Sequence, residues 1–238
     1  MKKIVLIIFL FQCSASAQIS IKKIKVNANK IQQYVTPKNL SSEDIVNGLK
    51  EALIIGATTS SNDASQIGGF NNNILIKIPF PKDAEKMKST LLKIGMQMQI
   101  EQFEVTINEA AEEASIFAKD IFIQEIKNIS IDDGQSILNG NENAATKFLE
   151  KKTTKELYLK FKPVIKTSIQ KVSLTKYWNV LVDSYNMIPL TKNVNVDLED
   201  YVTKKAISGL FTLIAKEEKN IRENPKARVS EILQKVFK

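Results

Sequence analysis

The chain has 238 residues, of which 43% are hydrophobic and 25% are charged, so it can bury a sizeable core and cannot be disordered throughout. Its formal net charge is +8 at pH 7, and it contains one cysteine and no histidine. The absence of histidine excludes a Ser-His-Asp triad, a Cys-His pair and zinc held by histidine.

Residues 1–17 have the pattern of a signal peptide. Two lysines precede a short apolar run, and a small-x-small triplet ends at Ala17, where we predict cleavage. The alternative is a lipoprotein anchored at Cys13, although the residues before this cysteine are bulkier than a lipobox usually has. The sequence thus predicts a periplasmic or secreted protein, and no later stretch is long and apolar enough to span a membrane.

The rest of the chain predicts an all-α fold. Residues 18–40 form a basic arm, and residues 41–238 are expected to fold as a single domain of about seven to nine helices. Ser41 begins the first helix with a capping box, and a loop rich in Ser, Asn and Gly is expected over 58–73. The one strand-like run, 74–78, is expected to be an extended segment or an isolated edge strand.

Apolar periodicity becomes clearest in the second half of the chain. Apolar residues spaced 4, 3, 4, 3, 4 over 103–121 predict one long helix, and a later helix is expected to bend or break at Pro163. The nearly continuous apolar run 206–215 is expected at the centre of the fold. Residues 224–225 are predicted to cap the last helix, with Val229 facing inward.

Charge is distributed unevenly along the chain. Residues 101–150 hold 3 basic and 11 acidic groups, a net of −8, whereas residues 151–192 hold 9 basic and 2 acidic groups, a net of +7. Complementary charge suggests that these neighbouring segments pack together as antiparallel helices. The alternative is two solvated faces that do not meet.

A first group of candidate site residues lies on the predicted long helix. Asn108 and Glu112 follow one flank of the apolar stripe together with further carboxylates, and other acids follow the opposite flank. Paired carboxylates can act as acid and base, or can hold Ca²⁺ or Mg²⁺ through oxygen. The alternative that we favour is the polar border of an amphipathic helix.

A second group follows the apolar run near the C-terminus. Glu218 and Arg222 are spaced as a helical ion pair, and Arg222 and Arg228 are the only arginines in the chain. Because the preceding residues are nearly all apolar, we predict that Glu218 and Arg222 form a partly buried pair. A planar guanidinium also suits a carboxylate or phosphate ligand, so all three residues are candidates for ligand binding.

A third group interleaves aromatic residues and lysines. Tyr158, Tyr177, Trp178 and Tyr185 alternate with basic residues, a composition that suits anionic lipid or lipopolysaccharide. Nucleic acid is an unsuitable partner for an exported protein. The alternative, which we favour, is core aromatics flanked by solvated lysines.

Several segments are similar to a bacterial family known only as domain-of-unknown-function family 4197. The resemblance covers nearly all of residues 40–238 and implies an exported helical protein of Gram-negative bacteria, with no assigned activity and therefore no catalytic residues to transfer. The matching segments are LSSEDIVNGLKEALIIG at 40–56, IKIPFP at 76–81, INEAAEEA at 107–114, ILNGNENAATKFL from 137, and GLFTLIAKEEKNIRENPKARVSEILQKVF at 209–237.

These observations lead to a functional hypothesis with one alternative. We predict an exported, non-catalytic protein without cofactor or metal that binds an apolar or amphipathic ligand between its helices, or an envelope protein. The alternative is a hydrolase of envelope glycans that uses two carboxylates, with Glu112 or Glu218 as the acid, because glycosidases need no histidine. A purely structural envelope protein is a third reading.

Overall fold

The computed structural model describes residues 40–130 and 134–237, and every regular element within them is helical. These residues form nine α-helices and no strand, which confirms the predicted all-α class. The predicted signal peptide, the alternative lipidation site at Cys13 and nearly all of the predicted arm lie outside the described residues. In the part that is described, no helix combines the length and the apolar character that crossing a bilayer requires.

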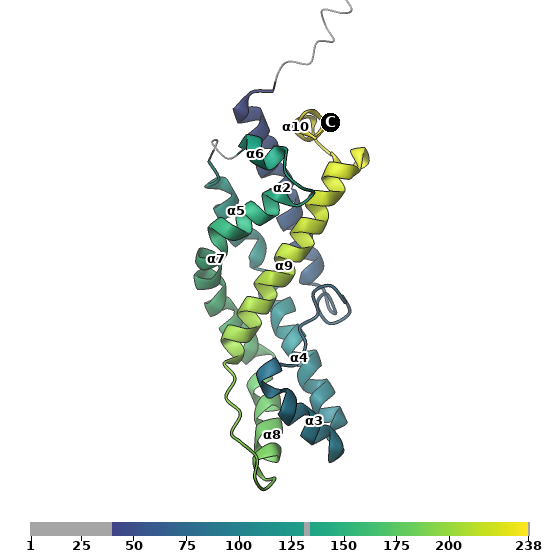
Figure 1. Ribbon diagram of the computed structural model, residues 1–238, viewed down its shortest axis with the longest axis vertical. Helices are drawn as coiled ribbons and strands as arrows, with labels where there is room; N and C mark the ends of the chain where they lie inside the picture. The colour runs from purple at the N-terminus through teal and green to yellow at the C-terminus, as the bar shows by residue number, and fades with distance from the viewer. Residues whose placement is uncertain (1–39, 131–133, 238) are drawn as a thin grey trace, which may run out of the picture. The chain divides into compact units, whose positions relative to one another are not determined.

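Three long helices, α2, α7 and α9, account for much of the fold (Figure 1). The remaining helices are shorter, and two 3₁₀ turns, η1 and η2, precede α3 and α10. The elements are α2 (Ser42–Ala64), η1 (Lys82–Ala84), α3 (Glu85–Lys93), α4 (Gln97–Ser115), α5 (Ala118–Lys127), α6 (Gly134–Leu138), α7 (Ala144–Lys171), α8 (Leu174–Asn186), α9 (Leu198–Glu223), η2 (Pro225–Ala227) and α10 (Glu231–Val236).

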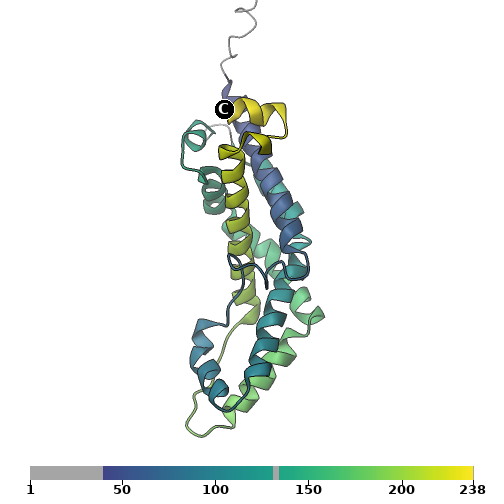
Figure 2. The ribbon, with the colours of Figure 1, turned by 90° about the vertical axis from the view of Figure 1, so that its right-hand side faces the viewer.

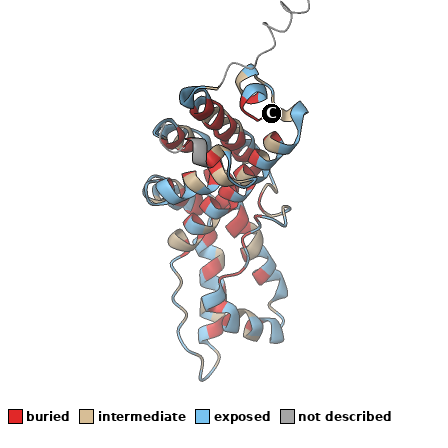
Figure 3. Ribbon diagram, turned by 45° about the horizontal axis from the view of Figure 1, so that its top comes forward, coloured by how far each residue is buried: buried red, intermediate tan, exposed pale blue. Residues whose placement is uncertain are grey.

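Helix α9 lies at the centre of the packing, as the apolar run 206–215 predicted. It packs along both α2 and α7 and also meets α4, and buried residues lie where these helices face one another (Figure 3). Leu210 on α9 is fully buried, and Phe211 stacks edge-to-face on Phe122 of α5 with ring centroids 5.2 Å apart. The start of α9 is capped by Asp197, whose side chain accepts from the backbone N–H of Asp200.

The aromatic residues of α8 belong mainly to the core. Trp178 packs against both Phe80 and Phe103, with ring centroids 6.0 and 5.1 Å away, and Tyr185 is also buried. The core interpretation therefore holds for Trp178 and Tyr185.

Oppositely charged segments do pack together. Helix α7 from the basic segment lies against α4 and α5 from the acidic segment. Lys171 contacts Glu113 at 2.5 Å, and Lys160 pairs with Glu125. The hypothesis of complementary neighbouring helices is thus confirmed, although an exposed pair such as Lys171–Glu113 stabilises a fold by less than about 1 kcal/mol.

The prediction of one long helix over 103–121 is wrong in one respect, because helix α4 ends at Ser115. The break redirects α5 so that it packs on α2 and brings Phe122 to Phe211. Its consequence is that Phe117, which continues the apolar stripe in sequence, is 52% exposed. A periodic pattern of apolar residues cannot predict a change in helix direction, because that change is determined by tertiary packing.

Two other helices are longer than the sequence predicted. Helix α2 continues through the predicted loop as far as Ala64, since Ser60 and Ser61 are small enough to be buried against its neighbours. Helix α7 continues through Pro163, which lies on its exposed face, where the missing hydrogen bond costs least. The chain turns instead at Ser173, whose φ of 57° lies in the left-handed region.

The C-terminal helix also begins later than predicted. Residues 224–225 open the 3₁₀ turn η2, Ser230 caps α10, and Val229 is 73% exposed instead of facing inward. The additional turn carries α10 onto α2. Gly48 permits this close approach, because a Cβ at that position would lie 2.6 Å from Cγ2 of Val236.

Candidate functional site

The predicted site residues form two clusters with different partners. Asn108 and Glu112 on α4 bind the loop 65–80, and we call this the loop cluster. Glu218, Arg222 and Arg228, on α9 and just after it, bind the ends of three helices, and we call this the α9 cluster. Among residues 40–130 and 134–237, no hydrogen bond or ion pair joins the two clusters.

Glu218 is a buried carboxylate that caps the first turn of another helix. Its Oε1 accepts the backbone N–H of Ala145 at 3.0 Å, and its Oε2 accepts the backbone N–H and hydroxyl of Thr146, both at 2.7 Å. Both amides belong to the first turn of α7, where backbone N–H groups have no partner within the helix. A negative charge at this end also suits the helix dipole.

Arg222 completes the α9 cluster from the same helix face. Its Nε donates to Oε1 of Glu218 at 2.8 Å, and its Nη1 and Nη2 donate to the carbonyls of Leu138 and Ile137 at the end of α6. The side chains of Glu218 and Arg222 are only 1% and 12% exposed, which confirms the predicted partly buried pair. The guanidinium also lies 5.3 Å from the ring centre of Phe237.

Arg228 closes the end of α9 itself. Its Nε donates to the carbonyl of Ile221 at 3.0 Å, and its Nη2 donates to the carbonyl of Arg222 at 2.7 Å. These carbonyls are among those that a helix leaves without partners at its C-terminus. Both arginines of the chain therefore bind backbone carbonyls at helix ends.

Glu112 accepts backbone N–H groups of the loop in the same way as Glu218 accepts those of α7. One carboxylate oxygen accepts the backbone N–H groups of Phe70 and Asn71 at 3.0 and 3.1 Å, and the other accepts that of Gly68 at 3.0 Å. The turn needs glycine here, since Gly68 has a φ of 78° and a Cβ at Gly69 would lie 2.5 Å from two carbonyl oxygens.

Asn108 pairs with the backbone of the same loop from one helical turn earlier. Its Oδ1 accepts the N–H of Ile78 at 2.8 Å, and its Nδ2 donates to the carbonyl of Ile78 at 3.0 Å. The predicted extended or strand-like run over 74–78 is wrong for residues 74–76, which form a turn in which the N–H groups of Ile76 and Lys77 donate to the carbonyl of Asn73. Only the end of the run, at Ile78, pairs its backbone with the side-chain amide of Asn108. This explains why a fully buried asparagine is tolerated on α4.

Each of the five predicted residues thus binds backbone groups of the fold, and Glu218 also binds the side chains of Thr146 and Arg222. Glu112 and Glu218 act as acceptors in every contact described above. Neither carboxylate lines the two pockets described next. These contacts add no support to the hydrolase alternative, and a ligand-binding role for the five residues stays a prediction.

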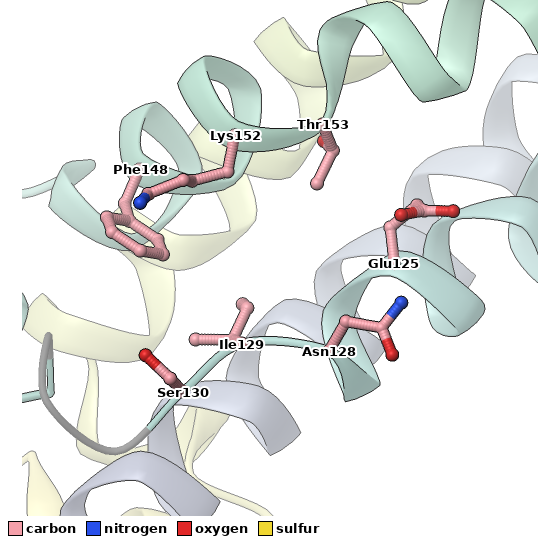
Figure 4. Close-up of a pocket in the computed structure, with 7 residues that line it drawn as sticks. All are labelled: Glu125, Asn128, Ile129, Ser130, Phe148, Lys152 and Thr153. Atoms are coloured by element: carbon pink, nitrogen blue, oxygen red, sulfur yellow. The ribbon is translucent and has the colours of Figure 1, made fainter.

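A first pocket, of about 210 Å³, lies between the end of α5 and the start of α7 (Figure 4). Its lining is mixed: Lys152 lies over the ring of Phe148 at 5.5 Å, and Glu125 is already held by Lys160. Sequence reasoning did not single out these residues. The lining residues are Glu125, Asn128, Ile129, Ser130, Phe148, Lys152 and Thr153.

A second pocket, of about 350 Å³, lies between the C-terminal end of α4 and the second half of α7, and we call it the α4–α7 groove. Its residues come from helices far apart in sequence, so no local motif could have indicated it. Phe117 is the lining residue that could have indicated the groove, because it is apolar and exposed. The predicted long helix instead placed it on the buried apolar stripe. The lining residues are Glu113, Phe117, Pro163, Val164, Thr167, Ser168 and Lys171.

The acidic residues of α4 do not assemble a metal centre. Nowhere in the described ranges do three Asp, Glu, Cys or His side chains converge as ligands. Lys88 contacts Glu104 at 2.5 Å, which places a cation beside one of the carboxylates that the sequence offered for Ca²⁺ or Mg²⁺.

The N-terminal turn of α9 contains a group with a perturbed pKa. The hydroxyl of Tyr201 donates to the carbonyl of Pro79 at 2.9 Å, which fixes the end of the loop that Glu112 and Asn108 hold. Burial, with a smaller contribution from Asp83, raises the pKa of Tyr201 from 10.0 to about 12.

Alkaline destabilisation should therefore depend on Tyr201. Its folded-state pKa exceeds the unfolded value, so its contribution to stability is complete below pH 10.0 and is lost as the pH rises through about 12. We expect urea midpoints of the wild type to fall over this interval more steeply than those of Tyr201→Phe. Tyr177→Phe on α8 is the matched control, and equal slopes for all three proteins would contradict the assignment.

The comparisons with known proteins give one family match. The model of a family described as "Protein of unknown function (DUF4197)" matches residues 39–238. No curated protein and no solved structure matches the chain.

Proposed function

Because the chain belongs to the DUF4197 family, whose description assigns no activity, we propose a function from the geometry: an exported, non-catalytic protein that binds an anionic amphiphile in the α4–α7 groove. The observation that carries this proposal is the exposure of Ile116 and Phe117, 56% and 52%, beside a pocket of mainly apolar lining. Exposed large apolar side chains next to a concave site are typical of ligand binding.

The wall of the groove offers mainly carbon to a ligand. The hydroxyls of Thr167 and Ser168 donate to the carbonyls of Pro163 and Val164, one turn earlier on α7, at 3.2 and 3.1 Å. With these hydroxyls bonded to their own helix, the methyl groups of Thr167 and Val164 can face an apolar chain. A hydrocarbon chain therefore suits this wall better than a sugar does.

The rim of the groove supplies a charge for a polar head group. Lys171 is 63% exposed and reaches across to Glu113, which is 25% exposed, so the cation is the more accessible partner of this ion pair. An anionic head group, such as a carboxylate or a phosphate, would find a donor in Lys171. The proposed ligand therefore has an acyl-type body and an anionic head.

A fluorescent probe with the same chemistry tests the groove. Anilinonaphthalene sulfonate combines an apolar body with an anionic head, and the wild type should bind it with enhanced fluorescence. Val164→Glu places a carboxylate in the apolar wall and should weaken this binding about tenfold or more. Val180→Glu on α8 is the matched control, because Val180 is an exposed helical valine that does not line the groove.

The outcome separates a groove from nonspecific binding. If Val164→Glu and Val180→Glu bind the probe equally, the groove is not the site. Native mass spectrometry of the chain isolated from its source cells should find an anionic amphiphile that Val164→Glu lacks. Neither lipid nor bound protein appearing in the wild type would count against the proposal.

Export is proposed from residues 1–17, whose pattern supports cleavage after Ala17. The intact mass of the chain isolated from cells distinguishes the two forms of processing. A chain beginning at Gln18 supports a periplasmic or secreted protein, whereas a lipid-modified chain beginning at Cys13 supports an anchored one. An unprocessed chain would contradict both.

A further inference from the structure

Five large apolar side chains are exposed around two turns of the described chain. Leu92, Ile94 and Met98 surround the turn from α3 to α4, and Met187 and Leu190 follow the end of α8. Their exposed fractions range from 38% for Leu92 to 102% for Leu190. Single exposed apolar residues need no explanation, but a group of five at one place does.

The register of α4 and α8 places the two turns at the same end. Trp178 of α8 packs on Phe103 of α4, and Lys171, which precedes α8, pairs with Glu113 near the far end of α4. The two helices are therefore antiparallel. Moving forward from Trp178 and backward from Phe103 by the same number of residues reaches Met187 and Ile94, and both turns lie at the lower end of Figures 1 and 2.

The backbone turns sharply at this end, and the turn exposes an apolar side chain. Leu190 has a φ of 65°, a left-handed conformation that is unfavourable for a bulky residue, and its side chain is fully exposed. The hydroxyl of the next residue, Thr191, donates to the carbonyls of Tyr185 and Ile188 at 3.1 and 2.9 Å, so the turn closes the end of α8. These hydrogen bonds account for the backbone conformation but not for the exposed leucine, which an external partner would cover.

The charge of this end indicates the chemistry of the partner. Residues 86–100 and 184–196 contain four lysines and no Asp or Glu. Lys88 is neutralised by Glu104, but Lys86, Lys93 and Lys192 are exposed and have no ion-pair partner among residues 40–130 and 134–237. The nearest acids along the chain, at 85, 101, 183 and 197, lie outside both segments.

We propose that this end of the protein, which we call the apolar end, inserts its two turns into the interface of a bilayer that contains anionic lipid. Apolar side chains surrounded by unpaired lysines match the acyl boundary and the phosphates of such a surface. The five exposed side chains include no Trp, Tyr or Arg, the residues that contribute most to binding at protein–protein interfaces. Two copies of the apolar end would repel each other, because both carry unpaired lysines. The proposal is independent of the α4–α7 groove.

Vesicle co-sedimentation of the chain as isolated from its source cells tests the proposal. Vesicles of phosphatidylglycerol and phosphatidylcholine in equal parts should bind the wild type, and phosphatidylcholine alone should bind it far less. The double variant Met187→Asn, Leu190→Asn should bind the anionic vesicles about tenfold more weakly or less. Because asparagine tolerates the left-handed conformation better than leucine, Leu190→Asn should fold at least as stably as the wild type.

The matched control is the double variant Ile67→Asn, Ile74→Asn. These isoleucines are 102% and 94% exposed on the loop that Glu112 binds, away from the two turns, and their loss should leave vesicle binding unchanged. The triple variant Lys86→Gln, Lys93→Gln, Lys192→Gln should abolish the preference for anionic vesicles. Val164→Glu should keep vesicle binding, which separates a failure here from a failure of the groove.

Several results would overturn the proposal. Equal binding of the wild type to both vesicle types would show that anionic lipid is not required. Equal losses of vesicle binding in the two Asn double variants, one at the apolar end and one in the loop, would show that the apolar end is not the binding surface. Concentration-dependent association of the wild type that Leu190→Asn abolishes in the absence of vesicles would assign the apolar end to a second copy of the chain.

Discussion

Replacing Glu218 with glutamine is expected to lower the free energy of unfolding by about 3 kcal/mol, measured in urea at an unchanged denaturant slope. Glutamine would direct an N–H₂ group toward donors, either the amides of Ala145 and Thr146 or the guanidinium of Arg222. The guanidinium is only 12% exposed and would keep its charge without a carboxylate. One substitution would therefore disturb the ends of α6 and α7 together.

The chain provides a close control for Glu218. Glu231 and Lys235 form a pair with the same spacing on α10, but Glu231 is 90% exposed, so Glu231→Gln should change stability by less than about 0.5 kcal/mol. The double variant Glu218→Gln, Arg222→Met should lose less than the sum of the single losses. Additive losses would mean that the two side chains are not coupled. A ligand-binding role would instead leave the stability intact and remove the ligand that native mass spectrometry finds on the wild type.

Glu112→Gln is expected to lower the free energy of unfolding by about 2 kcal/mol, because three backbone N–H groups, those of Gly68, Phe70 and Asn71, share its two oxygens, and all three are buried or partly buried. The loop should also detach locally, since Glu112 is its main anchor on α4 together with Asn108. Limited proteolysis should then cleave within 65–80 while the helices stay folded.

Glu109 on the same helix provides the comparison for Glu112. It is exposed, so Glu109→Gln should leave the stability within about 0.5 kcal/mol of the wild type and the loop resistant to protease. Equal cleavage of the two variants would show that the carboxylate of Glu112 does not hold the loop.

The sequence predicted those parts of the fold that depend on local chemistry. The capping box at Ser41 and the apolar run 206–215 were identified correctly, because a cap or a stripe is complete within a few residues. The break after Ser115 and the extension of α2 into the predicted loop were not, because both depend on which helices lie alongside.

The candidate site was likewise predicted only where the interacting residues are close in sequence. The spacing of Glu218 and Arg222 after an apolar run was sufficient to predict a partly buried pair. Their other partners, the first turn of α7 and the last turn of α6, are distant in sequence and could not be inferred from spacing. The α4–α7 groove escaped prediction for the same reason, since it exists only where two separate helices meet.

The contact of Gly48 with Val236 has a consequence for how the protein is made. The first described helix, α2, is covered by the last two, α9 and α10, so much of its apolar face has no native neighbour until the C-terminus has been synthesised. Contacts between the two ends of a chain raise its contact order and slow its folding. A nascent chain that ends before α9 therefore lacks these neighbours and leaves α2 accessible to chaperones.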